Sequence, residues 1–401
     1  MTEFFGYSNA WLNEHQAQHT AREIWQQPAV WRALHRQLTA DRPYWQSFLA
    51  PLLADPRLQI VLTGAGSSAF AGRALAPWLR QQTGRDVKAY GTTDIVANPY
   101  HYLDPSRPLL LVSFARSGNS PESVAAVALA DQCVPACHHL LLVCNPDSQL
   151  CDWAAGKAHV CTQVMPEGTH DKSFAMTSSF SSMLLAGLLL LGPQDIAQTA
   201  APLARMADEC EQLLVRRQPQ VKALAAGGYR RYIVVGGSCF TGLAEEAALK
   251  MLELTAGNVA TRFDSSLGLR HGPKFMVDGH TLLLVLFSAD PYARQYDRDL
   301  WQELRRDGLA GVLCAFGGAG EAVEGVDVIY REDNDAWLMF PYLLLTQMLA
   351  FETSLALGIT PDNPSPGGSV NRVVQGVSIY PYAGAPAAAG DRSDKRGSAC
   401  I

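Results

Sequence analysis

The stretch LQIVLTGAGSSAFAGRALAPWL, residues 58–79, decides the fold. An apolar run leads into a glycine-rich turn and then into a segment with helical spacing, which is the pattern of a buried strand followed by a helix. The stretch RYIVVGGSCFTGLAEEAALKML, residues 231–252, has the same pattern. A further apolar run begins about fifty residues after the start of each, at Leu109 and Leu282. The matched spacing predicts an α/β unit that is present twice.

Continuous apolar strands joined by helices are typical of parallel sheets that are buried on both faces. We therefore predict an α/β fold with two doubly wound parallel sheets, each a three-layer α-β-α sandwich. The predicted division is a helical segment at residues 1–50, a first domain at 51–212, a second domain at 213–382 and a tail at 383–401. The tail consists mainly of small and polar residues, so we expect it to be disordered.

Composition excludes several classes of protein. The chain has 401 residues, of which 48% are hydrophobic, enough for two full cores. Its net charge of -6 gives no broad basic field, so we expect no nucleic-acid partner. The first residues do not form a secretory signal. The most apolar run, residues 183–192, is too short for a membrane span, which needs roughly 20 residues. We expect a cytoplasmic protein with no membrane partner.

Nine cysteines, an odd number, are scattered along the chain without the dense spacing of a disulfide scaffold, which favours reduced thiols. One cluster, Cys133, Cys137, His138 and His139, is compatible with a metal site. It has no CxxC pair and no second ligand pair at the spacing of a zinc finger. Buried thiols in an α/β core are the favoured interpretation, and we predict no metal there.

Two turns have the composition of an anion site. Ser67 and Ser68 follow the first strand, and Arg116, Ser117 and Ser120 follow the strand that begins at Leu109. Where a strand turns into a helix, free backbone N–H groups point at one place, and a guanidinium can bind two phosphate oxygens at once. Helix capping alone would explain either turn. Neighbouring parallel strands bring both turns to one edge of the sheet, so together they predict a phosphate site.

A dinucleotide-binding fold is the main competitor from another class, because Gly64-Ala-Gly66 also opens its fingerprint. The third glycine of that fingerprint is displaced. In such a fold an acidic residue at the end of a strand binds the ribose, but Asp86 stands before its strand and not at its end. No Gly-x4-Gly-Lys-Ser/Thr loop is present, which argues against a nucleoside triphosphatase.

Acid-base groups are concentrated in the second half. Glu246, Lys250 and Glu253 share one face of a helix that should end at Gly257, and the bland interpretation is a solvated ladder of ion pairs. His271 precedes Gly272-Pro273, a helix start whose positive end would favour a neutral imidazole. A lone histidine is more often structural.

In their order along the chain, these motifs resemble those of the sugar isomerase (SIS) family. The matches are Gly66, Ser67 and Ser68, the loop at residues 115–120, and the signature residues Lys250, Glu253 and His271. In the isomerase domain of glucosamine-6-phosphate synthase, the corresponding glutamate moves a proton between C1 and C2 and the histidine opens the sugar ring. The resemblance implies those roles for Glu253 and His271.

Within the family the chain is most similar to the AgaS group, through SFARSGNSPES, SSLGLRHGPKFMVD and SVNRVVQGVSIYP. That group is described as galactosamine-6-phosphate deaminase/isomerases, and in older descriptions as tagatose-6-phosphate ketose/aldose isomerases. Arg116 stands where the synthase has a neutral residue, Gly268 where it has a glutamate, and Gln375 where it has a Schiff-base lysine. We therefore expect no covalent lysine intermediate. No amidotransferase domain precedes the two units, which favours release of ammonia.

The resulting hypothesis is a deaminase/isomerase for a phosphorylated amino sugar. Ser67, Ser68, Arg116, Ser117 and Ser120 would bind the phosphate, and Lys250, Glu253 and His271 would form the catalytic group, without metal or cofactor. The second half has Ser288-Ala-Asp-Pro-Tyr in place of the serine-rich loop, so we expect one site per chain. The resemblance also implies a homodimer whose histidine comes from the neighbouring subunit. A plain aldose-ketose isomerase and a non-catalytic sugar-phosphate sensor remain the alternatives.

Overall fold

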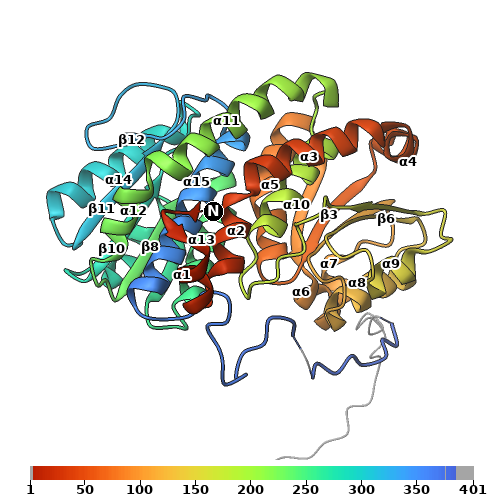
Figure 1. Cartoon of the computed structure of the whole chain (residues 1–401). Coiled ribbons are helices and arrows are strands. Elements are labelled where there is room, and N and C mark those ends of the chain that lie inside the picture. The colour runs from red at the N-terminus through yellow and green to blue at the C-terminus, as the bar shows by residue number, and fades with distance from the viewer. Residues whose placement is uncertain (1–2, 375, 385–401) are drawn as a thin grey trace, which may run out of the picture.

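Two parallel five-stranded sheets form the frame of the molecule (Figure 1). The computed structural model describes residues 3–374 and 376–384. The first sheet has the order β4-β3-β5-β6-β7, with β3 Gln59–Gly64, β4 Asp86–Gly91, β5 Leu109–Ala115, β6 Cys137–Val143 and β7 Val160–Val164. The second has the order β12-β11-β10-β8-β9, with β8 Arg231–Gly236, β9 Ala260–Asp264, β10 Thr281–Leu286, β11 Val312–Gly317 and β12 Asp327–Val328. All neighbouring strands in both sheets are parallel.

The helices alternate with these strands. Those before and within the first half are α1 Asn9–Glu14, α2 Gln18–Trp25, α3 Gln27–Ala40, α4 Arg42–Ala54, α5 Ser67–Thr83, α6 Thr92–Ala97, α7 Pro99–Tyr102, α8 Pro121–Cys133, α9 Gln149–Ala154 and α10 Ser178–Leu191. Those that follow are α11 Ala200–Arg216, α12 Gln218–Ala225, α13 Cys239–Leu254, α14 Ala293–Asp307 and α15 Asp335–Ala356, with short 3-10 helices at Ile196–Thr199, Gly268–Arg270 and Pro273–Met276. The predicted fold class, two doubly wound parallel sheets with helices at the amino terminus, is confirmed.

Two local expectations need correction. A small antiparallel hairpin, β1 Glu3–Phe4 with β2 Tyr7–Ser8, precedes the first helix and was not predicted. The helix expected to start at Pro273 is a 3-10 helix of four residues. The sharp bend at Gly272, where φ is 116°, and the extended backbone at Val277 confine it to one turn.

One large hydrophobic core joins the two sheets. It contains buried residues from both halves, and α5, α10, α13 and α15 lie in the middle of the molecule between the sheets (Figure 1). The close approach of α13 to α5 depends on Gly242, since a Cβ atom there would lie 2.5 Å from the backbone nitrogen of Ala74. The arrangement places the start of α5 beside the inner face of α13.

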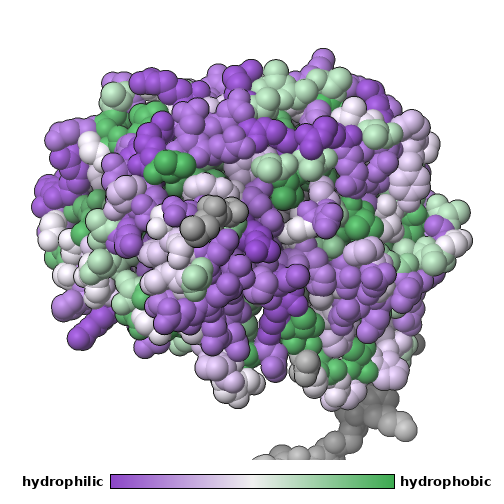
Figure 2. Space-filling view, viewed as in Figure 1, coloured by the Kyte–Doolittle hydropathy of each residue, from purple (hydrophilic) through white to green (hydrophobic). Residues whose placement is uncertain are grey.

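α15 is the one helix of the described part that is long and apolar enough to cross a membrane, and 94% of its most apolar window is buried inside the fold. It is therefore best explained as a core helix. On the face drawn in Figure 2, hydrophilic residues cover most of the surface and apolar residues are scattered among them. The domain boundaries at residues 50, 212 and 382 remain a proposal. α4 and α11 run across the first two of them.

Candidate active site

A pocket of about 260 Å³ lies at the carboxyl edge of the first sheet, where parallel sheets of this kind bind ligands. Its walls come from both turns of the first half, from a loop before α10, from α13 and from a segment near the carboxyl terminus. The lining residues are Ala65, Gly66, Ser67, Ser68, Phe114, Ala115, Arg116, Ser117, Gly118, Ser120, Ser123, Phe174, Met176, Leu249, Glu253, Val370, Asn371, Arg372, Val373 and Val374. A wider hollow of about 800 Å³ beside β7 has Lys157 as the single charged residue of its lining, which does not suit it to acid-base chemistry.

The first turn aims the start of α5 into this pocket. Gly66 has a φ of 55°, and α5 begins at Ser67 directly after it. This φ lies in the left-handed region that glycine tolerates. Ser67 and Ser68 are both buried, at 3% and 5% exposure. The backbone N–H of Ser68 donates to the carbonyl of Ala65 at 3.2 Å, and that of Ala69 donates to the carbonyl of Gly66 at 2.9 Å. The N–H of Ser67 and the two hydroxyls are therefore the groups at this end of α5 that can donate to an anion.

The second turn closes the opposite side. Ser120 is the N-cap of α8, and its Oγ donates to Oγ of Ser123 at 2.7 Å. Oγ of Ser117 accepts from the backbone N–H of Asn119 at 3.3 Å. Gly118, with a φ of 64°, has no room for a side chain, because a Cβ atom would lie 2.5 Å from Oγ of Ser148. All five residues predicted to bind phosphate therefore line one pocket.

Arg116 is buried in this wall and already engaged. Nη1 donates to the carbonyl of Phe174 at 2.9 Å, and Nη2 donates to the carbonyl of Arg372 at 2.7 Å. A guanidinium has five N–H donors, so three remain for a ligand. Arg116 thus both holds two pocket walls together and offers charge to the cavity.

The wall at residues 370–374 was not predicted as part of the site. Arg372 fixes it by donating from Nε to the carbonyl of Ser173 at 2.9 Å and from Nη2 to the carbonyl of Asp171. The signal for it in the sequence was SVNRVV, which served there only as a mark of family resemblance. Gln375, the residue that replaces the Schiff-base lysine, lies outside the described residues.

Glu253 brings a carboxyl group into the pocket from the second half. Nζ of Lys250, which is 1% exposed, donates to Glu253 and lies 3.6 Å from Oε1 of Glu246. Glu246 is fully buried, and neither of its oxygens has a hydrogen-bond partner within the described residues. The bland interpretation of these three residues as a solvated ladder is therefore wrong, because α13 turns this face toward the interior.

Burial sets the charges of this group. It raises the pKa of Glu246 to about 8. The positive charge of Lys250 lowers this pKa, and the nearby Glu253 raises it further, but burial has the largest effect. Burial also opposes the charge of Lys250, but the two neighbouring carboxylates outweigh it and raise the pKa of the ammonium. The consistent state at neutral pH is a protonated Glu246 beside a Lys250–Glu253 ion pair.

His271 lies apart from this group. It is exposed, it ends the short helix Gly268–Arg270, and it is not among the residues that line the pocket. From the sequence, His271 was expected at the positive end of an α-helix. It lies instead between two 3-10 helices, Gly268–Arg270 and Pro273–Met276, so that expectation is wrong. Within one chain His271 therefore does not line the pocket that holds Glu253.

Comparisons of sequence and structure relate the chain to known proteins. The SIS domain model matches residues 52–192. A D-galactosamine-6-phosphate deaminase AgaS of Shewanella sp. strain ANA-3 is 45% identical over 92% of this chain and 94% of its own length. A solved protein from Clostridium novyi is 40% identical with a TM-score of 0.91, over 95% of this chain and all of that chain.

The tagatose-6-phosphate ketose/aldose isomerase of Escherichia coli is 41% identical with a TM-score of 0.84, over 91% of this chain and 97% of that chain. Each of these similarities covers more than nine tenths of this chain. The chain therefore belongs to the SIS family, within its AgaS group.

Proposed function

We propose that this protein is an enzyme that converts D-galactosamine 6-phosphate and water to D-tagatose 6-phosphate and ammonia. One observation carries the proposal: the carboxylate of Glu253, from the second half, lies in the same pocket as the two glycine-serine turns of the first half. A base is thereby held near the place where the turns can bind an anion. The names of the AgaS relatives supply the substrate.

The phosphate would bind between the two turns. Hydroxyls of Ser67, Ser68, Ser117 and Ser120 and the start of α5 would donate to it, together with the N–H groups of Arg116 that remain free. Charge-assisted hydrogen bonds contribute roughly 1.5 to 3 kcal/mol each, so a few of them suffice to anchor the ligand. Binding at this end fixes the sugar chain with its first carbons toward α13.

The chemistry is one proton transfer followed by hydrolysis. After the ring opens, Glu253 removes the proton from C2 and an enolamine forms. The proton returns to C1, which gives a ketimine at C2, and water hydrolyses the ketimine to the ketose and ammonia. A carboxylate reaches both adjacent carbons. Lys250 would hold Glu253 in place through the ion pair.

Ring opening is the role that we propose for His271, acting from a neighbouring subunit of a homodimer. Two inactive variants test this, Glu253→Gln and His271→Asn, when they are mixed and allowed to exchange subunits. A mixed dimer would contain one complete site, so an equal mixture should regain about a quarter of wild-type activity. A mixture that stays inactive although mixed dimers form would place His271 outside the site.

The decisive measurement is ammonia release from galactosamine 6-phosphate and, separately, from glucosamine 6-phosphate. We expect release from the first substrate and its loss by a factor of at least about 100 in Glu253→Gln, the low end for a general base. Glu245→Gln is the matched control, since Glu245 is on the same helix, pairs with Arg73 and does not line the pocket. Full activity of Glu253→Gln would refute the assignment of the base.

A plain aldose-ketose isomerase is the second candidate, favoured by the name of the Escherichia coli structure. It would use the same residues, and it would interconvert tagatose 6-phosphate with its aldose without release of ammonia. Both candidates place the reaction in the cytoplasm and require no cofactor. Ammonia measurement separates them directly.

A further inference from the structure

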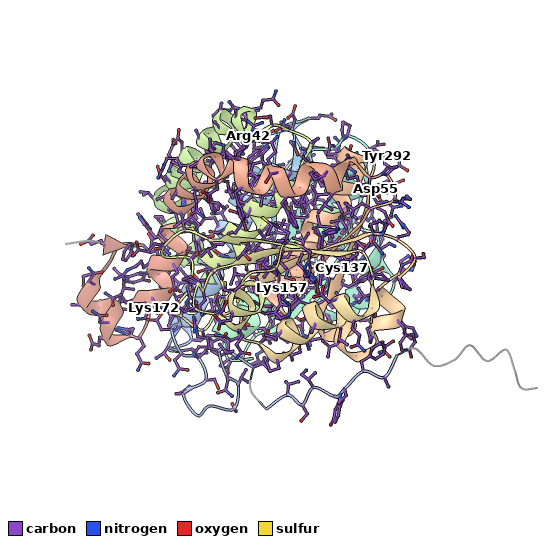
Figure 3. The ribbon with its side chains drawn as sticks, turned by 90° about the vertical axis from the view of Figure 1, so that its right-hand side faces the viewer. Arg42, Asp55, Cys137, Lys157, Lys172 and Tyr292 are labelled. Atoms are coloured by element: carbon purple, nitrogen blue, oxygen red, sulfur yellow. The ribbon has the colours of Figure 1, made fainter. Side chains whose placement is uncertain are left out.

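A second cluster of reactive side chains lies at the amino ends of β6 and β7, at the edge of the first sheet opposite to the pocket. It consists of Asp131 from α8, Cys137 and His139 from β6, and His159 just before β7. Cys137 and His139 are two residues apart on one strand, so their side chains share a face of the sheet. Figure 3 views the molecule from the side that carries Cys137 and Lys157.

Donor atoms of Asp131, His139 and His159 converge, and the thiol of Cys137 lies beside one of them, the imidazole of His139. One ligand atom from each of Asp131, His139 and His159 lies within 4.8 Å of the other two. Nε2 of His139 is 2.8 Å from Oδ1 of Asp131 and 3.3 Å from Sγ of Cys137. Nε2 of His159 is 3.3 Å from Oδ2 of the same carboxylate. The set comprises two imidazoles, one thiol and one carboxylate.

We propose that Asp131, Cys137, His139 and His159 form a binding site for a zinc ion, distinct from the phosphosugar pocket. Zinc prefers four nitrogen, sulfur and oxygen ligands in a tetrahedron, with bonds of roughly 2.0 to 2.3 Å. Neighbouring ligand atoms in such a tetrahedron are about 3.3 to 3.6 Å apart. The separations Cys137–His139 and Asp131–His159, both 3.3 Å, have this value, and the His139–Asp131 separation of 2.8 Å requires the carboxylate to withdraw by about half an ångström. Cys137, which is outside the group of three mutually close ligands, would have to turn its thiol toward Asp131 and His159.

Charge and surroundings also suit the ion. Burial raises the pKa of the Cys137 thiol, so the ion would have to displace its proton. The resulting thiolate and the carboxylate would together neutralise a divalent cation, and neutral imidazoles would complete the shell. His139 is fully buried, and its ring centroid lies 5.0 Å from that of Trp153. The ring of Trp153 also lies 6.5 Å from that of His159, and the ammonium of Lys157 lies 3.7 Å from the indole centroid. This indole shields the cluster from water. Asp131 and His159 remain partly exposed and leave an entry path.

The set considered from the sequence was different, Cys133, Cys137, His138 and His139, and no metal was predicted there. His138, included there, projects from the other face of β6 and packs against Phe48, with ring centroids 6.2 Å apart. Asp131 and His159 flank the original cluster along the chain and were not considered, because their approach depends on the packing of α8 and on the pairing of β6 with β7. A zinc ion at this place would tie three elements together far from the catalytic edge.

Titration of chelator-treated protein with Co²⁺ tests the proposal, because cobalt at a tetrahedral site with a thiolate gives a characteristic absorption. We expect one Co²⁺ per chain with a thiolate-to-cobalt band, displaced by Zn²⁺. Cys137→Ser should lose that band, and His159→Gln should weaken binding by about tenfold or more. His138→Gln is the matched control on the same strand and should bind as the wild type does.

His159 is half-exposed, so His159→Gln should fold even if Cys137→Ser does not, and circular dichroism verifies the fold of each. Zinc should also raise the melting temperature of the wild type more than that of His159→Gln. Absence of the thiolate band in the wild type, or equal affinity of the wild type and His159→Gln, would overturn the proposal. The four residues would then form a hydrogen-bonded cluster only.

Discussion

Replacing Glu246 with glutamine should remove a pH dependence from the stability of the protein. Burial raises the pKa of Glu246 from 4.5 to about 8 in the fold, so the folded chain holds a proton there that the unfolded chain releases. Because the pKa is higher in the folded state, this group stabilises the fold. The stabilisation is fully present below pH 4.5 and is lost as the pH rises toward 8. Glutamine keeps the shape of the protonated acid and does not titrate.

The expected size follows from linkage. Each unit of pKa difference corresponds to about 1.36 kcal/mol, so the wild type should lose about 5 kcal/mol of unfolding free energy between pH 4.5 and pH 8 through this group. Solvent does not screen this contribution appreciably, because Glu246 is fully buried. As the pH rises across this range, the free energy of unfolding of Glu246→Gln should therefore increase steadily relative to that of the wild type.

Urea denaturation at pH values between about 5 and 8.5, followed by tryptophan fluorescence, measures the effect. Glu14→Gln is the matched control, since Glu14 is exposed on α1 and the same isosteric change there should leave the pH profile parallel to that of the wild type. Parallel profiles for Glu246→Gln and the wild type would refute the reasoning. They would mean that Glu246 is ionised in the fold and that Lys250 is shared by two charged carboxylates.

Three further substitutions test the pocket and its support. Gly242→Ala places a Cβ atom 2.5 Å from the backbone of Ala74. It should therefore force α13 from α5 and lower the free energy of unfolding by about 1 to 3 kcal/mol in urea denaturation. Gly118→Ala is strained by its φ of 64° and its contact with Ser148, and steady-state kinetics should show a higher KM for the phosphosugar. Arg372→Gln should release the wall at residues 370–374 and raise KM with little change in melting temperature, whereas an unchanged KM would show that this wall does not contact the ligand.

The turns were predictable because they are local. A strand, a glycine turn and a helix follow one another within 58–79, so Ser67 and Ser68 could be assigned to the edge of a sheet before any tertiary contact was known. Glu253 was predictable in part, since helical spacing places it with Lys250 on one face. Spacing does not say whether that face is buried, and the burial depends on α13 packing against α5 at Gly242.

Phe174, Met176 and Arg372 could not be predicted from a periodic pattern, because they belong to irregular segments that meet through hydrogen bonds distant in sequence. The carbonyls of Phe174 and Arg372 both accept from Arg116, which comes from a third segment. A charged residue in a glycine-serine loop suggested an anion. It gave no indication that the same guanidinium also ties the loop before α10 to the carboxyl-terminal segment.

The second sheet shows why equal topology need not give an equal site. At its corresponding edge, Asp297 accepts from the backbone N–H of Ser288 at 2.9 Å, and Asp335 accepts from that of Ala289 at 2.7 Å. These donors follow β10 as residues 116–120 follow β5, but carboxylates of the chain itself already occupy them. An incoming phosphate would have to displace two buried carboxyl groups from these donors. In the proposed reaction, the second half would therefore supply the base and its ion pair through α13, while the first half would supply the donors that bind the phosphate.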